Sequence, residues 1–166
     1  GGEESYGFLP EDFVRDKDAV SACAILAEIA AWAKDQGITM YQLLQNIYVQ
    51  YGFSKEKGIS VVKKGKSGAE EIEAMMKHFR ENPLQEIAGS KVTLFYDYAS
   101  LKGKDYVENE TLTLDMPTTS NVLQYFTEDG TKVSIRPSGT EPKIKFYCEV
   151  HSKVKSLDEL PAAEKA

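Results

Sequence analysis

The chain has 166 residues, of which 42% are hydrophobic and 28% charged, and its formal net charge is −6 at pH 7. This composition is typical of a globular protein, and the negative balance disfavours general binding to nucleic acid or to a membrane surface, which needs clustered positive charge. The sequence has no apolar run of about 18 residues and no charged-then-apolar amino terminus, so neither a membrane span nor a signal peptide is predicted.

The cysteines and histidines indicate no metal site. Cys23 and Cys148 both fall in apolar patterns, which favours buried free thiols and a reducing, cytoplasmic location. His78 and His151 are isolated and show no metal-ligand spacing.

Both ends of the sequence indicate a piece of a longer protein. The chain begins with GGEESYGF, which resembles the middle of a loop and lacks a start methionine. Near the other end, Ser156 and Glu159 predict a capping box that opens a helix with few residues left to form it.

The first third of the chain is predicted to be helical. Apolar residues recur at helical spacing over 16–34, with Asp16 or Asp18 as the N-cap, and a second helix with its own capping box follows over 39–51. These two helices need a sheet or further helices to cover them, and the chain supplies none before them. We therefore interpret residues 1–55 as the end of a truncated α/β domain.

A domain boundary is expected in the lysine- and glycine-rich segment 53–66, which contains only a short strand-like run at 59–62. Beyond it, Ser67 and Glu70 predict the start of a third helix, which ends at 82–83.

After this helix the hydrophobic period changes to two, which is typical of strands with one buried face. The predicted strands are 91–98, 111–116, 122–127, 132–136 and 144–150. Asp129-Gly130 predicts a tight hairpin between two of them. Residues 56–166 therefore predict an α+β domain with one small antiparallel sheet and helices on one of its faces.

The turn before the last strand, residues 136–142, reads RPSGTEP. Its prolines fix φ on either side of Gly139, which can take a positive φ, and such a turn can direct successive backbone N–H groups into an anion-binding concavity. Ser138 and Thr140 add hydroxyl donors, and Arg136 adds a planar fork that matches two phosphate oxygens.

Lys143 and Lys145 add positive charge beside this turn, which is a local exception in an acidic chain. Judged by residue chemistry alone, two interpretations are equally good. The turn binds a phosphate, or it is a solvated hairpin loop whose arginine caps a carbonyl.

Two motifs favour the first interpretation by resemblance. RPSGTEPKIKFY resembles the phosphate-binding loop in the last domain of the α-D-phosphohexomutases, the phosphoglucomutase and phosphomannomutase superfamily. GGEESYGF resembles the sugar-recognition loop of that family's third domain, and RDKDAVSACAILAEIA between the motifs is also similar. The resemblance covers almost the whole chain and implies a fourth-domain fold like that of the TATA-box-binding protein.

The resemblance also implies roles for individual residues. Glu3 and Ser5 would bind sugar hydroxyls, although an acidic turn like this one is otherwise usually just solvated. Lys17 falls where related phosphoglucomutases carry an active-site lysine. The phosphate that is not being transferred would be held by Arg136, Ser138, Gly139 and Thr140, with added charge from Lys145.

The reaction implied for the parent enzyme moves a phosphoryl group between the 1- and 6-positions of a hexose through a phosphoserine, with glucose 1,6-bisphosphate as intermediate and Mg²⁺ as cofactor. Neither the family's serine loop nor its metal loop is present, so we expect no catalytic or metal-binding residue here and no activity of this piece alone. The expected partners are a phosphosugar and the other domains of the parent chain. Tyr6 departs from some phosphomannomutases, which leaves the preferred sugar open.

Three alternatives remain. The parent enzyme could be a phosphopentomutase of the same superfamily. The chain could instead be a stand-alone phosphoanion-binding module, or an interaction domain that binds a protein partner.

Overall fold

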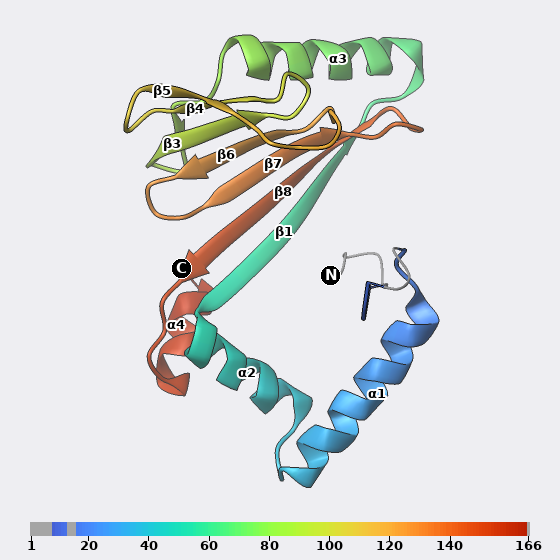
Figure 1. The fold of residues 1–166 in the computed structure, drawn as a ribbon, viewed down its shortest axis with the longest axis vertical. Helices are drawn as coiled ribbons and strands as arrows, with labels where there is room; N and C mark the ends of the chain where they lie inside the picture. The colour runs from blue at the N-terminus through green and yellow to red at the C-terminus, as the bar shows by residue number, and fades with distance from the viewer. Residues whose placement is uncertain (1–7, 13–15, 166) are drawn as a thin grey trace. The chain divides into compact units, whose positions relative to one another are not determined.

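The computed structural model describes residues 8–12 and 16–165 (Figure 1). The chain forms two compact units, which are described separately below. The first comprises the described residues of Gly1–Gly52 and Lys153–Ala166, and the second is Phe53–Ser152. No helix within the described ranges is both long enough and apolar enough to span a membrane.

The first unit is helical, as predicted, and its two long helices begin at the expected caps. Its helices are α1 (Ala19–Asp35), α2 (Met40–Tyr51), the 3₁₀ helix η1 (Leu157–Glu159) and α4 (Leu160–Lys165). The Asp18 carboxylate accepts hydrogen bonds of 2.9 Å from the amides of Val20 and Ser21. The capping box of α2 is also confirmed, since the Gln42 amide donates to Thr39 Oγ1 at 3.1 Å and the Thr39 amide to Gln42 Oε1 at 2.8 Å.

The capping box predicted near the C-terminal end is wrong. Ser156 makes no capping hydrogen bond with its side chain. Glu159 instead accepts from the Lys155 amide at 2.8 Å. The segment starts with a 3₁₀ turn, and this tighter winding replaces the predicted first α-helical turn.

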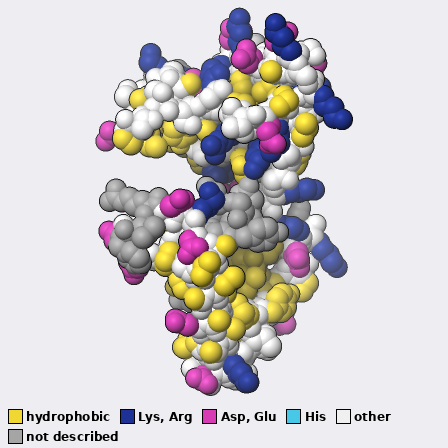
Figure 2. Space-filling model, turned by 90° about the vertical axis from the view of Figure 1, so that its right-hand side faces the viewer, with side chains coloured by type: hydrophobic (Ala, Val, Ile, Leu, Met, Phe, Trp, Pro, Cys, Tyr) yellow, Lys and Arg dark blue, Asp and Glu magenta, His cyan; other side chains and the backbone are white. Residues whose placement is uncertain are grey.

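Large hydrophobic side chains of α1 and α2 remain exposed. Val20 is 79% exposed, Trp32 53% and Tyr51 77%, and Figure 2 shows hydrophobic side chains along α1 in its lower half. Cys23, which was predicted to be buried, is exposed on α1. Only Ala22 and Ala33 of this helix are buried. The first unit therefore covers only part of the apolar surface of α1.

The second unit is one antiparallel sheet with a helix on one face, which confirms the predicted α+β class. The strand order is β1-β8-β7-β6-β3-β4-β5, with β2 paired to β3. The strands are β1 (Phe53–Val62), β2 (Glu86–Ile87), β3 (Ser90–Asp97), β4 (Lys102–Asp105), β5 (Glu110–Thr113), β6 (Leu123–Thr127), β7 (Lys132–Pro137) and β8 (Lys143–Ser152). The helix is α3 (Gly65–Glu81), which runs above the sheet in Figure 1.

Three local predictions in this unit are wrong. The short strand expected at 59–62 is the end of the ten-residue strand β1, which pairs along its whole length with β8. Helix α3 begins at Gly65 rather than after Ser67, and its N-cap Lys64 makes no side-chain capping bond. Strand β4 has the sequence KGKD, which lacks apolar alternation, and it forms by backbone pairing with β3 and β5.

The core lies between α3 and the sheet. Its buried residues are Ile72, Met76, Val92, Phe95, Leu123, Tyr125, Val133, Ile135 and Ile144. Tyr125 is fully buried, and its hydroxyl donates to the Phe79 carbonyl at 3.0 Å, which ties the sheet to the last turn of α3. Burial raises the pKa of Tyr125 to about 12.

A close backbone approach holds the start of α3 against the end of β1. A Cβ at Gly68 would lie 2.4 Å from the Lys63 carbonyl oxygen, so only glycine fits there. The Lys63 amide donates to the Pro142 carbonyl at 2.8 Å. The loop 138–142 between β7 and β8 is therefore connected through Lys63 to the first turn of α3.

Replacing Tyr125 with phenylalanine is expected to destabilise the second unit by about 1–2 kcal/mol, because the buried Phe79 carbonyl loses its donor. Urea unfolding at pH 7 measures this change in the free energy of unfolding. Tyr41→Phe is the matched control, since Tyr41 is 65% exposed and its variant should be unchanged. A Tyr125→Phe variant as stable as the wild type would contradict the assigned hydrogen bond.

The same tyrosine predicts a loss of stability in alkali. Its pKa is about 12 in the folded chain and about 10 when unfolded. The stabilisation is thus complete below pH 10 and is lost as the pH rises from 10 to 12. Unfolding free energies measured across this range should fall less steeply in Tyr125→Phe than in the wild type.

Gly68→Ala is expected to destabilise the second unit by about 1–3 kcal/mol, because the added methyl forces the Lys63 backbone to move. Amide chemical shifts of residues 138–141 and 143 should change with it, since the Lys63 amide bonds to the Pro142 carbonyl. Gly58→Ala is the matched control, because a Cβ at Gly58 meets no heavy atom within 4 Å. Unshifted loop amides in Gly68→Ala would show that α3 does not position the loop.

Candidate phosphate-binding site

Side chains of the β7–β8 hairpin point to two faces of the sheet. One face packs in the core, and the other carries the candidate site. Arg136 pairs with Lys145, and the flanking Ile135 pairs with Phe146. Ile135 is buried in the core while Arg136 is exposed. Because side chains alternate between the two faces of a sheet, Arg136 and Lys145 extend from the face opposite α3.

These side chains and the following loop form a cavity of about 410 Å³. It is lined by Arg136, Pro137, Ser138, Gly139, Thr140, Lys143, Lys145 and Tyr147. All five residues predicted near this end of the chain to hold a phosphate therefore share one cavity. Three of the lining side chains are cationic and none is acidic, so the cavity is positively charged.

The three cations differ in their surroundings. Lys143 Nζ lies 2.7 Å from Glu141 Oε2, and this hydrogen bond lowers the pKa of the Glu141 carboxyl. Lys145 Nζ lies 5.6 Å from the centre of the Tyr147 ring, in cation–π range. Within the described residues the Arg136 guanidinium forms no ion pair, so its bidentate fork is available to an anion.

The predicted anion-binding concavity of successive backbone N–H groups is not formed, because the amides of Ser138, Thr140 and Glu141 bond within the hairpin. The Ser138 amide closes the hairpin by donating to the Lys143 carbonyl at 2.7 Å. The amides of Thr140 and Glu141 point to Ser138 Oγ at 3.4 and 3.3 Å. Gly139 does not adopt the positive φ that was expected of it. The serine hydroxyl organises this turn instead, as serine side chains commonly do.

The resemblance assigned three further residues to the site. Glu3 and Ser5 lie outside the described residues. Lys17 lies in the first unit, immediately before the N-cap of α1, and its amide donates to Asp16 Oδ1 at 2.8 Å.

Sequence reasoning noted the charge of Lys143 beside the turn but did not count it among the phosphate-binding residues, and it did not single out Tyr147, although both line the cavity. The signal was present in the alternation of β8, because residues 143, 145 and 147 share one face of the strand.

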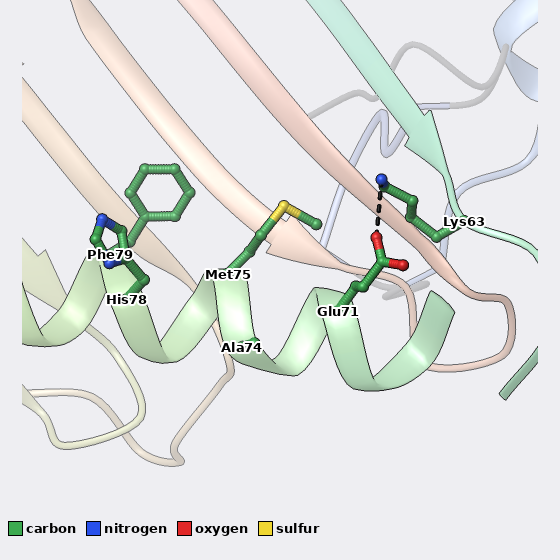
Figure 3. A pocket seen from close by; sticks show the side chains of 6 residues that line it. All are labelled: Lys63, Glu71, Ala74, Met75, His78 and Phe79. Atoms are coloured by element: carbon green, nitrogen blue, oxygen red, sulfur yellow. Dashed lines mark ion pairs between the residues drawn. The ribbon is translucent and has the colours of Figure 1, made fainter. Parts of the chain in front are cut away.

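A second cavity, of about 350 Å³, lies beside α3 (Figure 3). It is lined by Lys63, Glu71, Ala74, Met75, His78 and Phe79. Its lysine and glutamate are paired with each other at 2.8 Å. The remaining lining is largely apolar, so this cavity does not offer the charge that a phosphate needs.

The described residues contain no group of three or more histidine, cysteine, aspartate or glutamate side chains that could hold a metal ion. They therefore do not fit the Mg²⁺ expected for the parent enzyme.

Two family models and several curated relatives match this chain. The family model of the phosphoglucomutase/phosphomannomutase C-terminal domain matches residues 59–165, and that of the alpha/beta/alpha domain III matches residues 1–51. A phosphoglucomutase of Staphylococcus aureus (strain MRSA252) is 42% identical over 145 residues, covering 87% of this chain and 26% of the relative. A phosphoglucomutase of Staphylococcus haemolyticus is 38% identical over 149 residues, covering 90% and 27%.

Among solved structures, the open form of the exocytosis-sensitive phosphoprotein parafusin, a phosphoglucomutase from Paramecium, matches 87% of this chain and 24% of its own. Its TM-score is 0.47 and its sequence identity 18%. The chain spans about a quarter of the length of the curated relatives it matches. On the strength of the two domain matches and the two bacterial relatives, the chain belongs to the phosphoglucomutase/phosphomannomutase family.

Proposed function

We propose that this chain is the substrate-binding, C-terminal part of a phosphoglucomutase-type enzyme, and that its cavity at the β7–β8 turn holds the phosphate that is not being transferred. The observation that carries the proposal is the cavity itself, in which Arg136, Lys143 and Lys145 meet the hydroxyls of Ser138 and Thr140 without an acidic neighbour in the lining. Charged, bidentate donors of this kind suit a phosphate dianion.

In the parent enzyme, the proposed reaction interconverts sugar 1-phosphates and 6-phosphates through a phosphoserine and a bisphosphorylated sugar. The two bacterial relatives bear the name phosphoglucomutase, which supports a hexose rather than a pentose substrate. The contribution of this chain is positioning, because clamping the remote phosphate aligns the reacting one with the donor group. Glu3 and Ser5 would bind the sugar hydroxyls, and Lys17 would serve the active site.

The rest of the parent chain would supply the phosphoserine and the Mg²⁺ site. This chain alone is accordingly proposed to bind a phosphosugar without turning it over, and the parent is proposed to be cytoplasmic.

The anion can compete for the donors of the turn. The bonds from Thr140 and Glu141 to Ser138 Oγ are 3.4 and 3.3 Å long, at the weak end of the range. A phosphate oxygen forms shorter, charge-assisted bonds. Binding would therefore draw these amides away from the serine hydroxyl, whose own proton can also donate to the anion.

Glucose 1,6-bisphosphate titrated into the 166-residue chain is expected to shift the amide resonances of Gly139 and Thr140 at millimolar ligand. Arg136→Ala should weaken binding by about 10–100-fold, because it removes charge-assisted hydrogen bonds worth about 1.5–3 kcal/mol. Arg136→Lys should fall in between, since it keeps the charge and loses the fork.

Lys91→Ala is the control for net charge in this titration, because Lys91 is exposed on β3 and does not line the cavity. Its affinity should match that of the wild type. If Arg136→Ala binds the bisphosphate with wild-type affinity, phosphate binding by this cavity is refuted. It is also refuted if the amide chemical shifts of Gly139 and Thr140 do not change with ligand.

Glu141→Gln is expected to tighten binding of the bisphosphate by about two- to fivefold, because Lys143 loses its competing carboxylate partner and the region loses one negative charge. Isothermal titration calorimetry at low ionic strength measures the change, which should shrink at 0.5 M salt. An affinity lowered by the substitution would show that Glu141 supports the bound state rather than competing with it.

A further inference from the structure

The ammonium group of Lys145 lies over an aromatic ring within the candidate phosphate-binding cavity. Lys145 Nζ is 5.6 Å from the centre of the Tyr147 ring, which is within the range of a cation–π interaction. Both side chains line the cavity, and both are half-buried. Among the described residues that line the cavity, Tyr147 alone is aromatic. Its ring is therefore the surface of the lining that attracts a cation through its π-face.

The pleat of β8 sets these two side chains next to each other. Residues 145 and 147 extend from the same face of the strand, and their Cα atoms are about 6.6 Å apart at 3.3 Å per residue. Strand β8 runs away from the turn, so Tyr147 is farther along the strand from the turn than Lys145 is. Contact with the ring therefore directs the Lys145 side chain along the strand and away from the turn.

The neighbouring cations work against this position of Lys145. Arg136 lies directly opposite Lys145 on β7, and Lys143 extends from the same face of β8 two residues earlier. Like charges that are directly opposite each other in a sheet repel. Without a compensating contact, this repulsion favours arrangements in which Lys145 points away from the cavity.

Glu141 offers Lys145 a competing partner. The Glu141 carboxylate accepts a hydrogen bond of 2.7 Å from Lys143 Nζ. This hydrogen bond is the main cause of the lowered pKa of the Glu141 carboxyl, and the charge of Lys145 makes a smaller contribution. Lys145 is thus within electrostatic reach of the carboxylate. If Lys145 paired with Glu141, part of its charge and one of its donors would be lost to an incoming anion.

An aromatic ring holds an ammonium group differently from a carboxylate. The ring attracts the positive charge through its quadrupole, and this attraction is weaker than a close ion pair. An ammonium group has three N–H donors, and those directed away from the ring remain available to phosphate oxygens. The contact with Tyr147 can therefore persist while Lys145 binds an anion.

We infer that Tyr147 is a positioning residue for phosphate binding, whose ring holds the Lys145 ammonium at the cavity and away from Glu141. Tyr147 acts through Lys145 and needs no contact with the ligand. The aromatic ring is the active feature, and the hydroxyl group is not required. This inference rests on the proposed binding of phosphate in the cavity, and it assigns to that site a residue that does not itself bind the anion.

The position of Lys145 is tested first in the unliganded 166-residue chain by nuclear magnetic resonance. We expect a nuclear Overhauser effect between the ε-methylene protons of Lys145 and the ring protons of Tyr147, and the same contact in Tyr147→Phe. This measurement does not depend on phosphate. If the wild type shows no such contact, the positioning role is refuted while the proposed phosphate site remains open to its own test.

The affinity for inorganic phosphate is measured next, by titration of the amide chemical shifts of Gly139 and Thr140. Inorganic phosphate has no organic part that Tyr147 could contact. Tyr147→Leu should raise the dissociation constant about three- to tenfold, because Lys145 loses the ring. Tyr147→Phe should retain the wild-type affinity, since phenylalanine also attracts a cation. Tyr41→Leu is the matched control, because Tyr41 is 65% exposed and does not line the cavity.

A double-mutant cycle with Lys145→Ala separates positioning from a general structural role. In the Lys145→Ala background, Tyr147→Leu should change the affinity by less than about twofold, because the cation that the ring holds is gone. An equal loss in both backgrounds would refute the inference, since Tyr147 would then act independently of Lys145. Tyr147→Thr also lacks a ring and has a high strand propensity, so it repeats the comparison if Tyr147→Leu does not fold.

The outcomes distinguish the positioning role from the proposed function. If inorganic phosphate at high concentration shifts no amide of the turn in the wild type, the phosphate site is refuted and the positioning role with it. If phosphate binds to the wild type and the ringless variants bind it equally tightly, only the positioning role is refuted. It is also refuted if Tyr147→Phe loses as much affinity as Tyr147→Leu, because the hydroxyl group would then be the active feature.

Discussion

The pairing register between β7 and β8 is the constraint on which the site depends. With Arg136 opposite Lys145, the two cations share one face, while Ile135 and Phe146 face the core. A slip of one residue would bury a lysine and expose the apolar residues, so the hydrophobic core fixes the register strongly. The same packing energy that folds the unit thereby brings the positive charges together at the turn, against their mutual repulsion.

The turn is also anchored through Lys63 to the first turn of α3. The Lys63 amide binds the Pro142 carbonyl, and the Lys63 backbone lies against Gly68 in the first turn of α3. The Lys63 side chain adds an ion pair to Glu71 on the same helix. A loop anchored in this way loses little further conformational entropy when an anion binds, which favours affinity at a site made of few residues.

The sequence predicted features that depend on interactions between residues close in the chain, and it missed features that depend on residues far apart in the chain. The caps of α1 and α2 were predicted correctly because Asp18, Thr39 and Gln42 bond to amides within three residues. Strand β1 was largely missed because its pairing with β8 spans most of the unit and its own pattern is polar. The cavity lining was mostly predicted through motif resemblance, whereas the role of the Ser138 hydroxyl depends on loop geometry that no local pattern encodes.

The proposed reaction adds a requirement that the proposed site meets. A bisphosphorylated sugar must present either of its phosphates to one clamp, with its ring in two different orientations. A site that read the ring through many directional hydrogen bonds would favour one orientation and slow the other. Strict recognition of the phosphate at the β7–β8 turn, which is the same for both orientations of the ring, is what such chemistry calls for.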